Sequence, residues 1–202
     1  MKLTWMGHSC FLLESGDGSC VFDPYAPGSV PGLSLPELEA DMCLCSHGHA
    51  DHGCAGAVRL SGKKCALGVE AADTFHDGMR GALRGKNTVY TVTAEGMRVT
   101  HMGDIGHIPD EKTLAKIGKP DVLLIPVGGF FTVDAETALE IVRLLDARIV
   151  IPMHYRGEGF GYDAISTADA FVAGAENAVQ LYTNELTVTP DTPCMTAVLK
   201  CR

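Results

Sequence analysis

Three histidines and one aspartate lie within six residues, in the segment HGHADH at positions 47–52. Buried polar side chains need partners, whereas imidazole nitrogens and carboxylate oxygens are common ligands of divalent metals. His47 and His49 are two residues apart, so on an extended backbone both side chains point to one face and can bind one ion. Asp51 and His52 require a turn, which aims the second pair at a different point. The spacing favours a two-metal site over a solvated, histidine-rich loop.

Two metal ions that share a water need about seven protein ligands, so further ligands are expected at the ends of strands. Asp104 follows an expected strand at 97–101, and His154 closes the apolar run at 149–153. Three histidines, His76, His101 and His107, lie in the region from which the remaining ligand would come. His101 is three residues from Asp104, so on an extended chain the two side chains point to opposite faces.

The motif at 47–52, which follows the apolar run at 42–45, resembles the signature of the metallo-β-lactamase superfamily of metal-dependent hydrolases. The resemblance extends over nearly the whole chain, through Gly7-His8-Ser9, Phe22-Asp23-Pro24, Gly103-Asp104 and Ile151-Pro152-Met153-His154. It is strongest to the branch that contains ascorbate-6-phosphate lactonase and the N-acylphosphatidylethanolamine phospholipases. This resemblance implies an α/β fold, a four-layer αββα sandwich.

The resemblance also implies a ligand set. It assigns the first ion to His47, His49 and His76, the second ion to Asp51, His52 and His154, and a bridging role to Asp104. We expect His76 as the third histidine of the first ion, and His101 is the alternative.

Other polar residues are expected to act around these ligands. Asp51 and Asp104 take part in catalysis, and His107 is either a proton donor or substrate contact or an exposed loop histidine. His8, Asp23 and His101 are expected to support the ligands without binding metal. For His8 the alternative is a core or rim histidine, and for Asp23 it is the capping of local backbone N–H groups.

The predicted function is that of a binuclear hydrolase in which a metal-bridging hydroxide attacks a small anionic ester, lactone or phosphoester. Zinc is the expected metal, with manganese or iron as alternatives, because the ligands are imidazoles and carboxylates without thiolates. Two other functions stay open: a nuclease or phosphodiesterase of the same fold, and a non-catalytic metal-binding sensor module. A redox di-iron protein is disfavoured, because His49 stands where those relatives have a carboxylate ligand.

Composition and charge narrow the range of possible substrate classes. The chain has 202 residues, 46% of them apolar, which fits one hydrolase domain over 1–202 with a sizeable core. A formal net charge of -9 opposes binding to nucleic acid and favours a small molecule. Arg84, Lys86 and Asn87 form the densest group of anion-binding side chains, and we expect them at an anionic substrate unless they form a solvated turn.

The cysteines and the N-terminus predict a cytoplasmic protein. The 8 cysteines lie mostly within apolar runs, as reduced core residues do. Cys43 and Cys45 share a strand face but lack the second pair that a structural zinc site requires. No secretory leader is expected at the N-terminus, and no run approaches the ~18 apolar residues of a membrane span. The oligomeric state is not predicted.

The expected elements begin with strands and continue with alternating strands and helices. Strands are expected at 3–14 and 19–23, joined by a turn at 15–18, and at 41–46, 88–93, 97–101, 121–126, 148–151, 178–182 and 195–199. Helices are expected from 54 to 60, at 70–74, at 110–117, at 134–146 with Asp134 as N-cap, and from a Ser166 cap to Gly174. The loop at 26–36, rich in proline and glycine, is a candidate substrate wall.

Overall fold

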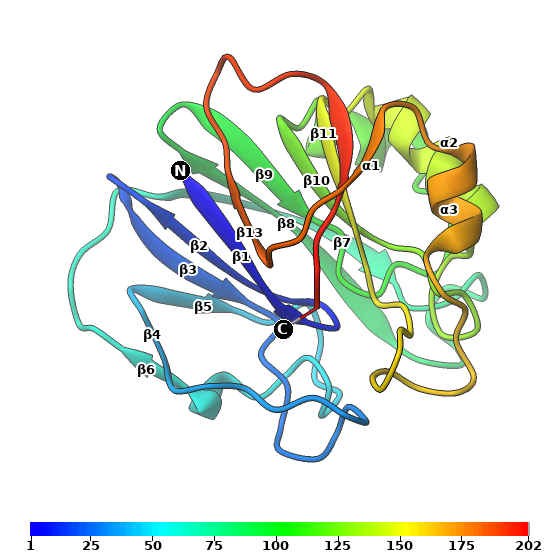
Figure 1. Ribbon diagram of the computed structural model, residues 1–202, viewed down its shortest axis with the longest axis horizontal. Coiled ribbons are helices and arrows are strands. Elements are labelled where there is room, and N and C mark those ends of the chain that lie inside the picture. Colours follow the sequence, from blue (N-terminus) through cyan, green and yellow to red (C-terminus); the bar gives the residue numbers. More distant parts are fainter. Residues whose placement is uncertain (202) are drawn as a thin grey trace.

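The computed structural model describes residues 1–201 and contains two large β-sheets that face each other (Figure 1). The first sheet has five strands in the order β13-β1-β2-β3-β5. Their bounds are β1 Lys2–Gly7, β2 Cys10–Ser15, β3 Gly18–Phe22, β5 Met42–Leu44 and β13 Glu185–Thr187. Along β2, Phe11 and Leu13 belong to the main core, whereas Cys10 belongs to a second apolar cluster on the other face. Both faces of this sheet are therefore covered.

The second sheet has seven strands in the order β12-β14-β11-β10-β9-β8-β7. Their bounds are β7 Gly68–Phe75, β8 Lys86–Ala94, β9 Met97–His101, β10 Val122–Pro126, β11 Ile149–Met153, β12 Ala178–Gln180 and β14 Met195–Val198. Strand β10 pairs in parallel with both β9 and β11. The carboxyl ends of these three strands share one edge, and Asp104 and His154 follow β9 and β11 there.

Three helices lie on the outer side of the seven-stranded sheet, away from the first sheet (Figure 1). They are α1 Glu111–Ile117, α2 Ala135–Leu145 and α3 Asp169–Gly174. Asp110 and Asp134 cap the first two helices, each accepting a hydrogen bond from the backbone N–H three residues on, so the predictions for α1 and α2 are confirmed. No helix within residues 1–201 is long and apolar enough to cross a membrane.

The other outer face, on the five-stranded sheet, is covered by short strands and loop. Strands β4 Leu38–Ala40 and β6 Val58–Leu60 pair in parallel there, and Tyr25 and Val30 complete the second apolar cluster. Two facing sheets with helices on one outer side match three layers of the expected αββα sandwich, but within residues 1–201 the fourth layer is not helical. The helix expected at 54–60 is instead one 3-10 turn, Ala55–Ala57, followed by β6.

Three further predictions of local structure are wrong. The expected strand at 3–14 is a hairpin of β1 and β2 that turns at His8, which has a φ of 52°. The helix expected at 70–74 is part of β7, which pairs antiparallel with β8 over its whole length. Cross-strand pairing here overrides the helical propensity of alanine and glutamate. Helix α3 starts at Asp169 after Ala168, so Ser166 is not its cap.

Candidate metal centre

The histidine motif occupies a loop after β5, and the buried carboxylate of Asp23 holds it at both ends. Ser46 donates to Asp23 from its backbone N–H and from its hydroxyl, each at 2.6 Å. Nδ1 of His52 donates to the same carboxylate at 2.8 Å, which leaves Nε2 of His52 free to face the site. Between them, the backbone N–H groups of His52 and Gly53 both donate to the carbonyl of His49. The end of the motif is therefore a closed turn, as expected for Asp51 and His52, whereas His47 and His49 lie in a bend and not on an extended strand.

Gly103 allows the loop that carries Asp104 to approach the histidine motif closely. Gly103 has a φ of +57°, and a Cβ on it would lie 2.3 Å from Oδ1 of Asn87. Only glycine fits both that conformation and that approach. The Asn87 Oδ1 accepts the backbone N–H of Asp104 at 2.9 Å, which fixes the start of the Asp104 loop.

Four histidine side chains converge on one oxygen of Asp104. The Nε2 atoms of His52, His76, His154 and His47 lie 3.1, 3.1, 3.2 and 3.9 Å from Oδ2 of Asp104. Oδ1 of Asp104 and the Nε2 atoms of His47, His52 and His154 are buried and make no hydrogen bond within residues 1–201. Buried polar atoms without partners are costly unless a ligand satisfies them. This donor set of imidazole nitrogens and carboxylate oxygens fits borderline divalent metals.

The potential ligand atoms fall into three overlapping groups, each within 4.8 Å. The groups are His47, His49 and His76; His47, His52 and Asp104; and His8, Asp51, His52 and His154. All seven residues expected to bind metal therefore lie together. His8, expected behind the ligands, lies among them: its Nε2 is 3.2 Å from Oδ2 of Asp51.

Burial and mutual proximity set the protonation of this cluster. Burial, reinforced by neighbouring histidines, lowers the pKa of His8 to about 3 and that of His47 to about 4. Burial alone would also lower the pKa of His52, but the carboxylates of Asp104 and Asp23 raise it well above the usual range. Burial would raise the pKa of Asp104, but His154 and His52 hold it well below its usual range. The carboxylate of Asp104 is thus held ionised and the imidazoles of His8 and His47 neutral, which are the forms that bind a cation, whereas His52 would release its proton when a cation binds.

His101 is buried behind the centre. Its Nε2 donates to the carbonyl of Ser9 at 2.8 Å, and its Nδ1 accepts the N–H of Gly103 at 3.1 Å. Its ring stacks on Phe22 with the planes 2° apart. Because both ring nitrogens have backbone partners, His101 belongs to none of the three groups, whereas His76 does.

The other residues expected at the site, His107, Asn87, Lys86 and Arg84, lie outside the three groups of potential ligand atoms. His107 accepts the N–H of Phe75 at Nε2 and donates to the carbonyl of Ile108 at Nδ1, and it belongs to none of these groups. Asn87 is 1% exposed, and its amide nitrogen donates to Thr74 and to the carbonyl of Met102. The prediction that Asn87 binds substrate is therefore wrong; it positions Asp104. Lys86 is exposed at the start of β8, and Arg84 lies half-buried just before it.

Two residues that sequence reasoning did not select lie beside the centre: Tyr162 contacts Asp51, and Phe131 contacts Tyr162. The hydroxyl of Tyr162 donates to the carbonyl of Ser29 at 2.6 Å and lies 3.3 Å from Oδ2 of Asp51. The Phe131 ring packs edge-on against Tyr162 and lies under the guanidinium of Arg84. Neither residue belongs to a motif, and no local spacing marks them. Through Ser29, the loop at 26–36 contacts Tyr162 beside the centre.

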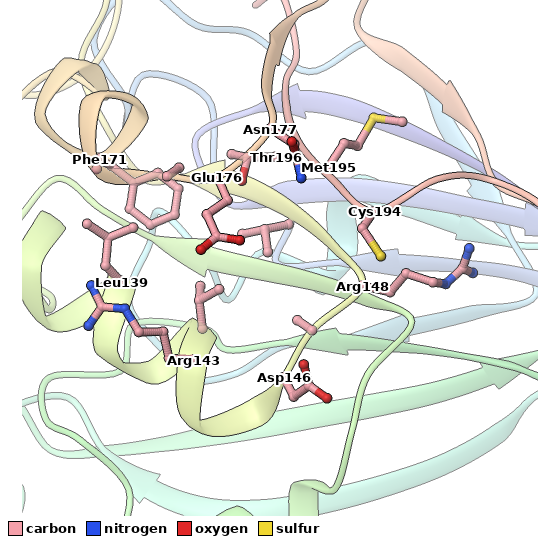
Figure 2. A pocket seen from close by; sticks show the side chains of 15 residues that line it. Leu139, Arg143, Asp146, Arg148, Phe171, Glu176, Asn177, Cys194, Met195 and Thr196 are labelled. Carbon is pink, nitrogen blue, oxygen red and sulfur yellow. The ribbon is translucent and has the colours of Figure 1, made fainter.

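A separate cavity of about 340 Å³ lies at the opposite end of β11. Leu139 and Arg143 of α2, Phe171 of α3 and Cys194 surround it (Figure 2). Arg148 precedes β11 and His154 follows it, so the length of the strand separates this cavity from the metal centre.

Comparison with known proteins defines the class. Residues 2–154 match the family model described as a β-lactamase superfamily domain. A Thermotoga maritima crystal structure from the metallo-β-lactamase superfamily aligns with a TM-score of 0.76 and 29% identity, covering 100% of this chain and 99% of that one. A metallo hydrolase from Ignicoccus hospitalis aligns with a TM-score of 0.66 at 22% identity, over 85% and 88% of the two chains, and shares the fold. The fold and the His/Asp cluster are those of a metal-dependent hydrolase.

Curated relatives give the family within that class. The UPF0173 metal-dependent hydrolase of Methanoculleus marisnigri is 33% identical over 189 residues, which cover 77% of this chain and 81% of the relative. The one from Carboxydothermus hydrogenoformans is 32% identical over 191 residues, covering 77% and 84%. The chain therefore belongs to the UPF0173 family of metal-dependent hydrolases in the metallo-β-lactamase superfamily.

Proposed function

We propose that this chain hydrolyses a small anionic ester, lactone or phosphoester at a centre for two divalent ions. The convergence of four histidine Nε2 atoms on Oδ2 of Asp104 is the observation that supports two ions most directly. One oxygen cannot satisfy four buried imidazoles, whereas two cations can share them with both oxygens of the carboxylate.

The proposed residue roles are those that the family resemblance implies, and the proximity of the ligand atoms in the three groups supports them. His47, His49 and His76 would hold one ion, Asp51, His52 and His154 the other, and Asp104 would contact both. Bound divalent ions lower the pKa of water toward neutrality and stabilise charge that develops on a carbonyl or phosphoryl oxygen. Asp23 orients His52, and Asn87 and Gly103 orient Asp104. His8 and Tyr162 contact Oδ2 of Asp51 at 3.2 and 3.3 Å, and the same oxygen lies 3.6 Å from Nε2 of His52.

Zinc is the proposed metal, with manganese and iron as alternatives, because the ligand set has no thiolate. An anionic small molecule is the proposed substrate, because a net charge of -9 disfavours polyanions, while Arg84 lies over Phe131, which packs against Tyr162 beside Asp51. We propose a cytoplasmic location, because the cysteines lie mostly within apolar runs, as reduced core residues do, and all eight are free thiols.

Metal content and turnover test this proposal together. Protein loaded with zinc, manganese or iron is expected to hold two ions per chain, and Asp104→Ala is expected to lose at least one. A panel of carboxylic esters, lactones and phosphodiesters, the latter two motivated by the lactonase and phospholipase resemblance, is expected to include a substrate whose turnover His47→Ala abolishes. Preference for phosphodiesters and salt-sensitive RNA binding would favour the nuclease alternative. Two bound ions without turnover of any compound would favour the sensor module.

A further inference from the structure

We propose that Arg84, Phe131 and Tyr162 form a substrate wall that selects molecules in which an apolar segment separates an anionic group from the hydrolysed bond. This inference rests on the proposed function and specifies its substrate. The three residues come from segments far apart in the sequence, and the tertiary fold places them in a row that ends at Asp51.

Arg84 provides the cation at the outer end of the row. Its guanidinium carbon lies 5.7 Å from the centroid of the Phe131 ring, a cation–π geometry. No carboxylate within residues 1–201 forms an ion pair with it. In a chain of net charge -9, a half-buried arginine without a carboxylate partner remains available to an anionic ligand.

Two aromatic rings separate that cation from the metal centre. The Phe131 and Tyr162 rings are 5.7 Å apart at 69°, and the Tyr162 hydroxyl is 3.3 Å from Oδ2 of Asp51. An anion on Arg84 is therefore not at the reacting bond. The part of the substrate between them must lie along ring faces and edges, which favours an apolar segment.

The surroundings of the row are also apolar. Leu83, next to Arg84, is 71% exposed, and Phe130, next to Phe131, is 65% exposed. The Phe130 ring packs edge-on against Phe131, 4.7 Å away. Large apolar side chains exposed beside an enzyme centre are typical of a surface that contacts a ligand.

The wall is preorganised. The carboxylate of Asp77 accepts backbone hydrogen bonds from Met79, Gly81, Leu83 and Arg84 at 2.7 to 3.0 Å, so the Arg84 loop is wrapped around it. Asp77 directly follows His76, which ties the same loop to the metal centre. At the other end, the hydroxyl of Tyr162 is fixed by the carbonyl of Ser29. A wall that is already ordered binds its ligand without a large ordering cost.

Matched 4-nitrophenyl esters test the proposal on the metal-loaded enzyme. Monoesters of succinate, adipate and suberate carry a carboxylate at increasing distance from the bond, and the butanoate, hexanoate and octanoate esters are their uncharged counterparts. The charged-to-uncharged ratio of kcat/KM is expected to rise with length, because a short acid cannot reach Arg84 from Asp51. A parallel series that ends in phosphate distinguishes the two anions, and an Arg84-dependent preference in either series supports the proposal.

Two variants assign the preference to Arg84. Arg84→Gln is expected to reduce the ratio for the longer esters about tenfold, the loss of one charged hydrogen bond. Arg80→Gln is the matched control, because Arg80 is an exposed arginine in the same loop, and it is expected to keep the ratio. Equal ratios at all lengths, or equal ratios in wild type and Arg84→Gln, would overturn the proposal.

A binding measurement separates this proposal from the proposed function. If the metal-loaded enzyme cleaves no ester, calorimetry with 6-phenylhexanoate and with the uncharged 6-phenylhexanol tests whether the wall still binds an anionic ligand. Tighter binding of the acid that Arg84→Gln removes and Arg80→Gln keeps would retain the wall and contradict the hydrolysis. Equal binding of the two compounds, or a preference that survives in Arg84→Gln, would overturn the wall itself.

Discussion

The backbone N–H of His154 donates a hydrogen bond to the carbonyl of His8 at 3.2 Å, and this bond joins the two large sheets beside the metal centre. Both residues have a left-handed backbone, with φ values of 53° and 52°, and their rings are 4.1 Å apart. The indole N–H of Trp5 donates to the same carbonyl of His8 at 3.0 Å. Such conformations are costly outside glycine and persist where surrounding contacts fix them. The packing of the two sheets therefore sets the position of both imidazoles.

Replacing His8 tests whether its ring supports Asp51. Asparagine tolerates a left-handed backbone and cannot reach Asp51 as imidazole does, so His8→Asn removes the ring contact with little backbone strain. Metal affinity, measured by competition with a chromophoric chelator, is expected to fall about 10- to 100-fold for one of the two ions. Wild-type affinity for both ions in His8→Asn would show that Asp51 does not need His8.

Asp23→Asn tests the carboxylate that orients His52. The amide cannot accept from Ser46 and His52 on both oxygens, so metal affinity is expected to fall about 10- to 100-fold. Asp41→Asn is the matched control: the Asp41 carboxylate accepts from Ser19 and Ser61 between β3 and β6, and none of these residues belongs to the metal groups. It is expected to reduce stability while metal affinity is retained. Similar metal loss in both variants would indicate a general structural effect.

His76→Ala and His101→Ala separate the two candidates for the third histidine. His76→Ala is expected to lose or greatly weaken one ion, because Nε2 of His76 lies among the converging ligand atoms. His101→Ala is expected to keep two ions per chain with lower activity. Elemental analysis after gel filtration gives both stoichiometries, and the reverse pattern would exchange the two roles.

Metal removal is expected to destabilise the protein. The unpartnered atoms of His47, His52, His154 and Asp104 remain buried in the folded chain, and ions that bind only this state stabilise it by mass action. Treatment with a chelator is expected to lower Tm, and added zinc is expected to restore it in proportion to the logarithm of its free concentration. A Tm that does not respond to either addition would contradict the ligand set.

Asp77→Asn is expected to make the free energy of unfolding less dependent on pH in the acidic range. Burial acts to raise the pKa of Asp77, but the four backbone N–H donors bring it below its usual value. A folded-state pKa below the unfolded value of about 3.9 gives stability that is present above this pH and is lost as pH falls through the folded pKa. Urea unfolding is expected to show Asp77→Asn less stable than wild type at about pH 7, with the difference shrinking below about pH 4. A constant difference would show that ionisation of Asp77 does not contribute.

Local sequence determined the ligand types, two capped helices and the fold class. The motif at 47–52, Asp104 after β9 and His154 after β11 are readable because metal chemistry restricts residue type and because strand ends meet at one edge. Asp110 and Asp134 mark α1 and α2, since an N-cap acts within one turn of its own helix.

Tertiary structure alone decided which polar residues face the metal centre and which support it. His8 turns toward Asp51 because β1 and β2 form a hairpin, and Asn87 turns inward because Gly103 allows β8 and the Asp104 loop to approach. Strand β7 forms because it pairs with β8 over its whole length, and this pairing outweighs the helical propensity of the β7 residues. The row of Arg84, Phe131 and Tyr162 likewise depends on contacts between segments far apart in the chain. Residue spacing encodes only what lies within a turn or a strand, whereas these positions depend on how two sheets pack.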